Sequence, residues 1–452
     1  MLIERFYDER LAQASYLVGC QARGEAIVID PARDVHPYLE KAAAHGLTIV
    51  AVTETHIHAD YLSGTRQLAE ESGAIMLLSD EGPPEWKYAF ARPQDRLLKH
   101  GDKIHIGNLI LEVLHTPGHT PEHLSFLLTD TPASPEPVGL FSGDFLFVGD
   151  VGRPDLLERA AGYRDTMRAG AATLFRSLQQ LKALPGHLQI WPAHGSGSAC
   201  GKALGAVAQS VLAYERTSNW ALKIESEDAF IEAILEGQPE PPRYFAQMKY
   251  LNKFGPPLLT STHLPRLKAS RLDDLLEQKQ WVVDTRGEAA YALGHAPGSL
   301  FLPNGNAFVN WAGWILPYDQ PIYLISDRPG YFLKALQSIG LDRVEGYFPP
   351  EDVLTLAQPS QRLEATEYAS ADCALIDVRS QKEWDAGHMP GAEHRFLGNL
   401  LAELESLPAQ PTFYCGSGLR SLIASSLAER AGKSPRDVRG GFAALQKVLQ
   451  PV

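Results

Sequence analysis

Four clusters of histidine and aspartate side chains, each placed after a short apolar stretch, constrain the fold of this chain most strongly. The apolar stretches read as β-strands, and side chains that can bind a metal follow each of them. The stretches are 49–52, 109–114, 139–141 and 188–191, and the clusters are His56-Ile57-His58-Ala59-Asp60, His115-Thr116-Pro117-Gly118-His119, Ser142-Gly143-Asp144 and Pro192-Ala193-His194-Gly195. Loops on a rigid scaffold build metal sites in this way, whereas a lone histidine is usually an ordinary core or loop residue. The four clusters together predict a metal site.

The order of these motifs, H-x-H-x-D, T-P-G-H-T, G-D and P-x-H, resembles the metallo-β-lactamase superfamily in its glyoxalase II branch. The resemblance implies an αββα sandwich, in which two packed β-sheets carry helices on their outer faces, for residues 1–236. The superfamily includes hydrolases, dioxygenases and other redox enzymes, so this fold does not by itself define the reaction.

The residue after Asp60 favours one metal over two. Hydrolases of the superfamily often hold a second metal with a histidine at this position, where the present chain has Tyr61. A phenol is a poor substitute for a neutral imidazole near pH 7, although other ligands can compensate. Within the superfamily, the chain resembles the persulfide dioxygenases most, and these hold a single Fe(II) with two histidines and one aspartate.

Carried over to this chain, that resemblance implies one Fe(II) bound by His56, His119 and Asp144. A set of two histidines and one carboxylate leaves coordination positions open for O2 and a sulfur substrate. His58, Asp60 and His194 are then expected to contact the ligands and waters, not the metal itself, and to orient them. His115 and His123 are expected to be structural.

Length and composition indicate a protein of several domains. At 452 residues the chain is too long for one ordinary core. A formal net charge of −13 argues against nucleic acid and anionic membranes as partners. We expect a cytoplasmic protein, because no signal peptide and no apolar stretch of about 20 residues is visible. The four cysteines are too few and too scattered to form a disulfide framework; they are Cys20, Cys200, Cys373 and Cys415.

Periodicity and composition divide the chain further. Helices are predicted over 35–45, 61–72, 166–184 and 203–217. Three prolines within 236–242 and the string Gly255-Pro256-Pro257 predict an interdomain linker over 237–265.

The remaining chain contains a repeat with a spacing of 93 residues. The strings are Val282-Val283-Asp284-Thr285-Arg286 with Leu375-Ile376-Asp377-Val378-Arg379, and Gly294-His295-Ala296-Pro297-Gly298 with Gly387-His388-Met389-Pro390-Gly391. Two copies of D-x-R followed by G-H-x-P-G indicate an internal duplication. They resemble the rhodanese, or sulfurtransferase, domain, which implies two α/β domains with parallel sheets, over 266–356 and 357–452.

The two copies differ in the loop where rhodanese chemistry would occur. In the second copy, a strand-like stretch precedes the loop Cys415, Gly416, Ser417, Gly418, Leu419 and Arg420, which matches the family's C-x-x-G-x-R pattern. Small residues let backbone N–H groups turn inward at a helix start, and this stabilises a thiolate or persulfide. The aligned loop of the first copy has Asp327 at the thiol position and Phe332 at the arginine position, so this copy is expected to be inactive.

Cys200 has two alternative roles. It lies six residues after His194, in a Gly- and Ser-rich stretch that is able to return to the metal, where its thiol would hold or relay a persulfide. The alternative is a small apolar residue at a helix start. Cys20 and Cys373 are expected in the core.

The combined resemblance is to a bacterial persulfide dioxygenase–sulfurtransferase fusion. It implies oxidation of a low-molecular-weight thiol persulfide by O2 to sulfite, and transfer of sulfane sulfur to sulfite at Cys415 to give thiosulfate. The carrier thiol, glutathione, coenzyme A, cysteine or bacillithiol, stays open, and a dimer or tetramer is expected. Two alternatives remain: a zinc thioester hydrolase of the glyoxalase II kind joined to rhodanese domains, and a non-enzymatic sulfur carrier with a structural metal.

Overall fold

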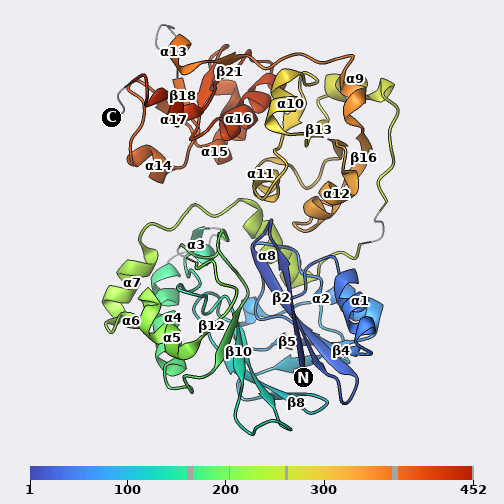
Figure 1. The fold of residues 1–452 in the computed structure, drawn as a ribbon, viewed down its shortest axis with the longest axis vertical. Coiled ribbons are helices and arrows are strands. Elements are labelled where there is room, and N and C mark those ends of the chain that lie inside the picture. Colours follow the sequence, from blue (N-terminus) through green and yellow to red (C-terminus); the bar gives the residue numbers. More distant parts are fainter. Residues whose placement is uncertain (160–165, 203, 260–262, 369–374, 450–452) are drawn as a thin grey trace. The chain divides into compact units, whose positions relative to one another are not determined.

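The computed structural model describes residues 1–159, 166–202, 204–259, 263–368 and 375–449. The chain divides into two compact units, Met1–Thr260 with Gln337–Gly340, and Ser261–Leu336 with Leu341–Val452. Both units combine helices with β-sheets, as predicted for an α/β multidomain protein (Figure 1). Among the described residues, no helix has the length and apolar character needed to span a membrane.

Two six-stranded sheets form the first unit. The first sheet has the order β1-β2-β3-β4-β5-β6 and the second the order β12-β11-β10-β9-β8-β7. The strands of the first are β1 (Leu2–Asp8), β2 (Gln13–Cys20), β3 (Glu25–Ile29), β4 (Thr48–Thr53), β5 (Ile75–Ser79) and β6 (Arg96–Leu98). Those of the second are β7 (Lys103–Ile106), β8 (Leu109–His115), β9 (Leu124–Asp130), β10 (Gly139–Gly143), β11 (Gln189–Pro192) and β12 (Ser210–Val211). The four strands predicted before the metal-binding clusters are therefore β4, β8, β10 and β11.

The core of this unit lies between the sheets. Alternate residues of β2, such as Ala14, Tyr16 and Val18, pack against residues of the second sheet such as Phe126 and Phe141. Two further apolar clusters join the outer face of each sheet to its helices. The helices are α1 (His36–Ala44) and α2 (Thr65–Ser72) on the first sheet, and α4 (Met167–Leu181), α5 (Leu212–Ser218), α6 (Trp220–Lys223) and α7 (Glu227–Leu235) on the second, with the short η1 (Pro84–Trp86) and α3 (Leu156–Arg159) in connections. This is the predicted αββα sandwich.

Two segments differ from the sequence prediction. The helix expected over 203–217 is only α5, because residues 210–211 instead pair with β11 as strand β12; residue 203 lies outside the described residues. The segment 237–265, expected as a linker, contains helix α8 (Tyr244–Phe254), which belongs to the first unit. The prolines on either side of α8 are typical of linkers. However, Tyr244, Phe245 and Met248 form a buried face of the helix.

Two parallel sheets form the second unit, with the orders β14-β13-β15-β16 and β17-β21-β20-β18-β19. The first contains β13 (Trp281–Asp284), β14 (Leu300–Phe301), β15 (Ile322–Ile325) and β16 (Val344–Phe348), with α9 (Ser270–Glu277), α10 (Glu288–Leu293), α11 (Ala307–Ile315), α12 (Pro329–Gln337) and η2 (Pro350–Val353). The second contains β17 (Arg362–Leu363), β18 (Leu375–Asp377), β19 (Glu393–His394), β20 (Thr412–Tyr414) and β21 (Arg436–Val438), with α13 (Ala365–Tyr368), α14 (Gln381–Asp385), α15 (Leu397–Glu403), η3 (Leu404–Ser406), α16 (Leu419–Arg430) and α17 (Gly441–Leu445).

The two motif copies occupy similar local positions in these sheets. In both copies the first central strand, β13 or β18, lies between its neighbours in the same way and pairs with them in parallel. The aspartate that ends this strand is buried and holds the motif arginine two residues later. The Nη2–Oδ2 distance is 2.7 Å for Arg286 and Asp284 and 2.6 Å for Arg379 and Asp377. In each copy, the aspartate and arginine of the D-x-R motif thus form an ion pair at the end of the strand.

Candidate metal centre and thiol loop

The structure brings His56, His119 and Asp144 together at the ends of strands β4, β8 and β10. Their ligand atoms all lie within 4.8 Å of one another, and the three side chains are buried. The Nε2 atoms of His119 and His56 lie 3.6 Å and 3.9 Å from Asp144 Oδ2. The loops after three separate strands therefore assemble the ligand set that the sequence predicts.

Hydrogen bonds on the far side of each imidazole leave one nitrogen facing this centre. His119 Nδ1 donates to the Arg153 carbonyl (2.9 Å), so its Nε2 lone pair is available. Burial lowers the pKa of His119 to about 3 and, together with His58, holds the pKa of His56 well below its usual range. Both imidazoles are therefore neutral near pH 7, which is the form that binds a metal.

Asp144 is the clearest sign that a cation belongs here. Both of its carboxylate oxygens are buried and have no hydrogen-bond partner among the described residues. Burial raises the pKa of this carboxyl group, because the ionised form lacks solvent. A buried carboxylate facing two neutral imidazoles is costly unless a cation completes the site. The donor set thus fits a metal ion.

Asp30, which sequence reasoning missed, positions His56. The Asp30 carboxylate accepts hydrogen bonds from Thr55 N (2.6 Å) and Thr55 Oγ1 (2.9 Å). Because the Thr55 hydroxyl is used as a donor, it accepts from His56 Nδ1 (3.0 Å), and His56 Nε2 faces the centre. The signal in the sequence was only an aspartate at the end of β3, with no motif around it.

His58 also pairs with Asp30 and does not join the ligand group. Its Nε2 lies 3.0 Å from Asp30 Oδ1. Burial disfavours the imidazolium, but the charges of Asp30, Glu54 and Asp60 outweigh it and raise the pKa of His58 to about 9. The Tyr61 hydroxyl donates to the Asp30 carbonyl (3.1 Å). Both side chains thus brace the loop that carries His56.

A second group of possible ligands lies beside the first and consists of Asp60, His194 and Cys200. His194 Nδ1 donates to the Ala12 carbonyl (3.0 Å), and its Nε2 lies 3.4 Å from both Asp60 Oδ2 and Asp144 Oδ1. Burial raises the pKa of the Cys200 thiol well above its usual range, and Asp144 and Asp60 act in the same direction. The stretch after His194 therefore places the neutral Cys200 thiol beside the metal centre.

The remaining predicted positions have structural contacts. His123 Nε2 accepts from the Asp144 backbone N–H (3.1 Å), which makes its Nδ1–H the donor to Thr116 Oγ1 (2.8 Å). His115 Nε2 donates to the Pro121 carbonyl (2.8 Å). Cys20 is buried in the core between the sheets, and Cys373 lies outside the described residues.

In the second unit, Cys415 lies in the loop between β20 and α16, as its motif predicts. The thiol is buried, and Gly418 N–H donates to Cys415 Sγ (3.1 Å). Gly418 has a φ of +111°, a conformation that glycine adopts without strain, and it directly precedes α16. Arg420 Nη1 and Nη2 bind Glu383 Oε2 and Oε1 at 2.7 Å and 2.6 Å. A helix N-terminus and an adjacent guanidinium favour negative charge on sulfur.

The equivalent loop of the first copy is one residue shorter, which corrects the alignment drawn from sequence. Asp284 pairs with Ile325 as Asp377 pairs with Tyr414, so Ser326 occupies the position of Cys415, and Asp327 lies one residue beyond it. Helix α12 begins at Pro329, which has no N–H to donate toward the loop. Phe332 is buried against Phe308, with ring centroids 4.8 Å apart. This loop lacks the thiol, although the Arg328 N–H donates to Ser326 Oγ (3.0 Å).

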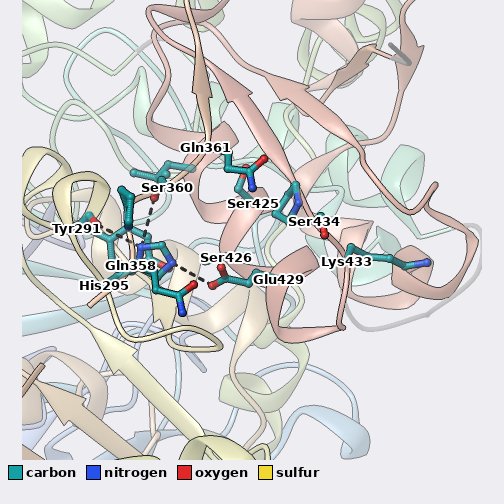
Figure 2. Close-up of a pocket in the computed structure, with 13 residues that line it drawn as sticks. Tyr291, His295, Gln358, Ser360, Gln361, Ser425, Ser426, Glu429, Lys433 and Ser434 are labelled. Atoms are coloured by element: carbon teal, nitrogen blue, oxygen red, sulfur yellow. Dashed lines mark hydrogen bonds and ion pairs between the residues drawn. The ribbon is translucent and has the colours of Figure 1, made fainter. Parts of the chain in front are cut away.

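The first copy also contacts α16 directly (Figure 2). His295, from its G-H-x-P-G motif, lies with Nε2 3.0 Å from Glu429 Oε2, and Gly298 N–H donates to the same oxygen (3.1 Å). A cavity of about 200 Å³ beside this contact is lined largely by hydroxyl and amide side chains, including Ser425 and Gln358. The G-H-x-P-G loop of the first copy thus holds the helix whose N-terminus faces Cys415.

Comparison with known proteins identifies both kinds of domain. The family model described as Metallo-beta-lactamase superfamily matches residues 8–194, and that of the Rhodanese-like domain matches residues 357–447. A crystal structure of a metallo-beta-lactamase from Staphylococcus aureus subsp. aureus COL shares 44% identity, with a TM-score of 0.72 over 77% of this chain and 99% of that chain.

Curated relatives of the chain include a persulfide dioxygenase and a hydroxyacylglutathione hydrolase. The mitochondrial persulfide dioxygenase ETHE1 of Mus musculus is 28% identical over 43% of this chain and 68% of its own length. A hydroxyacylglutathione hydrolase of Nostoc punctiforme is 33% identical over 40% of this chain and 63% of its own length. The chain thus spans less than two thirds of that hydrolase.

Proposed function

Because the chain belongs to the metallo-β-lactamase superfamily and carries a rhodanese-like domain, we propose that it oxidises thiol persulfides at a mononuclear iron centre and transfers sulfur at Cys415. The observation that carries this proposal is the combination of two sites on one chain. One is a buried set of two histidines and one carboxylate, a donor set that leaves coordination positions open, and the other is a buried thiol at a helix N-terminus. Similarity to a persulfide dioxygenase supports it.

At the first site, a thiol persulfide, O2 and water give the thiol, sulfite and protons. His56, His119 and Asp144 would hold the iron, which would supply the binding of O2 and the redox chemistry. The protein contributes neutral imidazoles in fixed orientation, through the Arg153 carbonyl on one side and Asp30 with Thr55 on the other. Burial of the three ligands excludes bulk water from the reacting sulfur.

At the second site, Cys415 takes the sulfane sulfur from a second persulfide and passes it to sulfite. The thiolate attacks the outer sulfur, the carrier leaves as a thiol, and Cys415 holds a persulfide. Sulfite then attacks that sulfur, which gives thiosulfate and regenerates the thiolate. The Gly418 N–H and Arg420 stabilise the anionic sulfur through both steps. Joining both sites on one chain raises the effective concentration of sulfite at Cys415.

The proposal also includes the remaining expectations from the sequence. The substrate is a persulfide of glutathione, coenzyme A, cysteine or bacillithiol, and the iron content is one ion per chain. Residues 266–356 are a rhodanese domain that has lost its thiol. The protein acts in the cytoplasm as a dimer or tetramer.

A zinc-dependent thioester hydrolase is the second candidate, because hydroxyacylglutathione hydrolases match the first unit. In that case a metal-bound water would be the nucleophile. Tyr61 counts against a two-metal hydrolase, since its hydroxyl is engaged by the Asp30 carbonyl. Oxygen uptake with a persulfide, set against hydrolysis of a glutathione thioester, distinguishes the two.

The ligand assignment is tested by removing one donor at a time. His119→Ala should lose most of the iron and all persulfide-dependent O2 uptake, because two remaining ligands hold Fe(II) weakly. His58→Ala is the matched control. Because the His58 side chain faces Asp30, this variant should retain more metal than His119→Ala. Full iron content and activity in His119→Ala would overturn the assignment.

A further inference from the structure

Helix α8 fixes one face of the metal-binding loop, although it lies outside the residues that match the superfamily. The buried Asn252 on this helix accepts a hydrogen bond from Ser63 N–H (2.9 Å) and donates to the carbonyls of His58 (2.9 Å) and Tyr61 (2.8 Å). Lys249 lies three residues earlier on the same helix, so both side chains project from one face. Lys249 therefore lies on the face of α8 that is bonded to the loop carrying His58 and Asp60.

Lys249 is a buried cation without a hydrogen-bond partner among the described residues. Its side chain is 7% exposed, and its Nζ lies 4.6 Å from the centre of the Trp86 ring. Burial lowers its pKa to about 8, although Glu122 and Cys200 act in the opposite direction. A buried ammonium is costly to retain in a core unless an anion neutralises it. A residue with these properties beside a metal centre is a candidate for binding a charged ligand.

The neighbours of Lys249 place its charge at the candidate metal centre. It is close enough to the His119 imidazole and to the Cys200 thiol to interact electrostatically with both. Glu122, which also interacts with it, accepts from the Ile57 N–H through Oε1 (2.8 Å), and its Oε2 is buried without a hydrogen-bond partner among the described residues. Cys200 itself is held as a neutral thiol. The ammonium is thus within electrostatic reach of the ligand His119 and of Cys200 beside it.

We propose that Lys249 binds the anionic sulfur group that reacts at the metal, which is the terminal sulfur of the persulfide and then the sulfite formed from it. The inference rests on the proposed function. An anion at this position would supply the partner that the buried ammonium lacks. The ammonium would in turn favour substrate and product in their charged forms.

Sulfite binding tests this without turnover. Calorimetry would measure sulfite affinity in the full iron-loaded chain without O2, in a Cys415→Ser background that removes the second thiol. Lys249→Met should weaken binding roughly tenfold or more, the usual effect of losing a charge-assisted hydrogen bond. Lys249→Arg should recover most of the affinity, because it retains the charge. The control is Lys253→Met on the same helix, whose Nζ donates to the Glu85 carbonyl (2.7 Å) and which should bind sulfite normally.

Kinetics separate the reacting sulfur from the carboxylates of the carrier. O2 uptake would be followed with glutathione persulfide and with cysteamine persulfide, which has no carboxylate. Lys249→Met should raise KM by a similar factor for both carriers. An effect confined to glutathione persulfide would overturn the proposal, because Lys249 would then bind a carboxylate. Unchanged sulfite affinity in Lys249→Met would also overturn it.

Two checks keep these outcomes interpretable. Lys249→Gln, which keeps a polar group of similar length, replaces Lys249→Met if the latter does not fold, and the same loss of affinity is expected. If the wild-type chain consumes no O2 with any persulfide, the proposed function fails. In that case the calorimetric comparison still decides whether Lys249 binds an anion.

Discussion

Replacing Asn252 with alanine should strongly destabilise the first unit. The substitution removes three buried hydrogen bonds and leaves the Ser63 N–H and the carbonyls of His58 and Tyr61 without their partner. At roughly 1 kcal/mol or slightly more for each bond, the expected loss is about 3 to 4 kcal/mol of unfolding free energy. The loop that carries the metal ligands should also loosen, so iron content should fall.

Urea unfolding of the metal-free chain, followed by tryptophan fluorescence, would measure this loss in the transition of the first unit. The control is Tyr250→Ala, because Tyr250 lies on the same helix and is 58% exposed. That variant should stay within about 0.5 kcal/mol of the wild type. A loss below about 1 kcal/mol in Asn252→Ala would refute the reasoning, because the three bonds would then contribute almost nothing.

Three further predictions concern the two sites. Hydrogen bonds from Arg420 and Ser380 outweigh burial and lower the pKa of Glu383 to about 2, so the ionised carboxylate stabilises the fold. Urea unfolding would measure the difference in unfolding free energy between the wild type and Arg420→Ala. This difference should be complete at a pH above the pKa of Glu383 in the unfolded chain, and it should shrink as the pH falls toward 2. Ser326→Cys in a Cys415→Ser background should form no thiocyanate from thiosulfate and cyanide, because the residue five positions later is Tyr331, where the Cys415 loop has Arg420. Acidification should release the metal, because burial raises the pKa of Asp144 and the protonated carboxyl binds poorly; dialysis at about pH 5 followed by metal analysis checks this.

The ligand set was predictable from sequence because each ligand follows its own strand. His56, His119 and Asp144 come directly after runs that form β4, β8 and β10, and the ends of neighbouring strands lie close together in a sandwich. The same reasoning left two roles open for Cys200, and the structure places its thiol with Asp60 and His194. The local sequence pattern was sufficient to predict the position of a residue that lies a few positions from the end of a strand.

Contacts between distant segments were not predictable in the same way. Asp30 orients His56 through Thr55, but nothing in the residues around it indicates which loop it meets. Lys249 and Asn252 lie in a segment whose flanking prolines favoured a linker, and only their burial on α8 reveals a role. The position of Ser326 depended on loop length, which strand register fixes and sequence spacing does not.

The central claim is tested most directly by the oxygen consumed and the sulfur products formed when the iron-loaded chain, purified without air, receives glutathione persulfide. The account predicts one O2 consumed for each sulfite produced, with much of that sulfite recovered as thiosulfate. Cys415→Ser should consume O2 at the same rate but release free sulfite, once the uncatalysed formation of thiosulfate has been subtracted. A chain that retains zinc, consumes no O2 and hydrolyses a glutathione thioester would contradict the account.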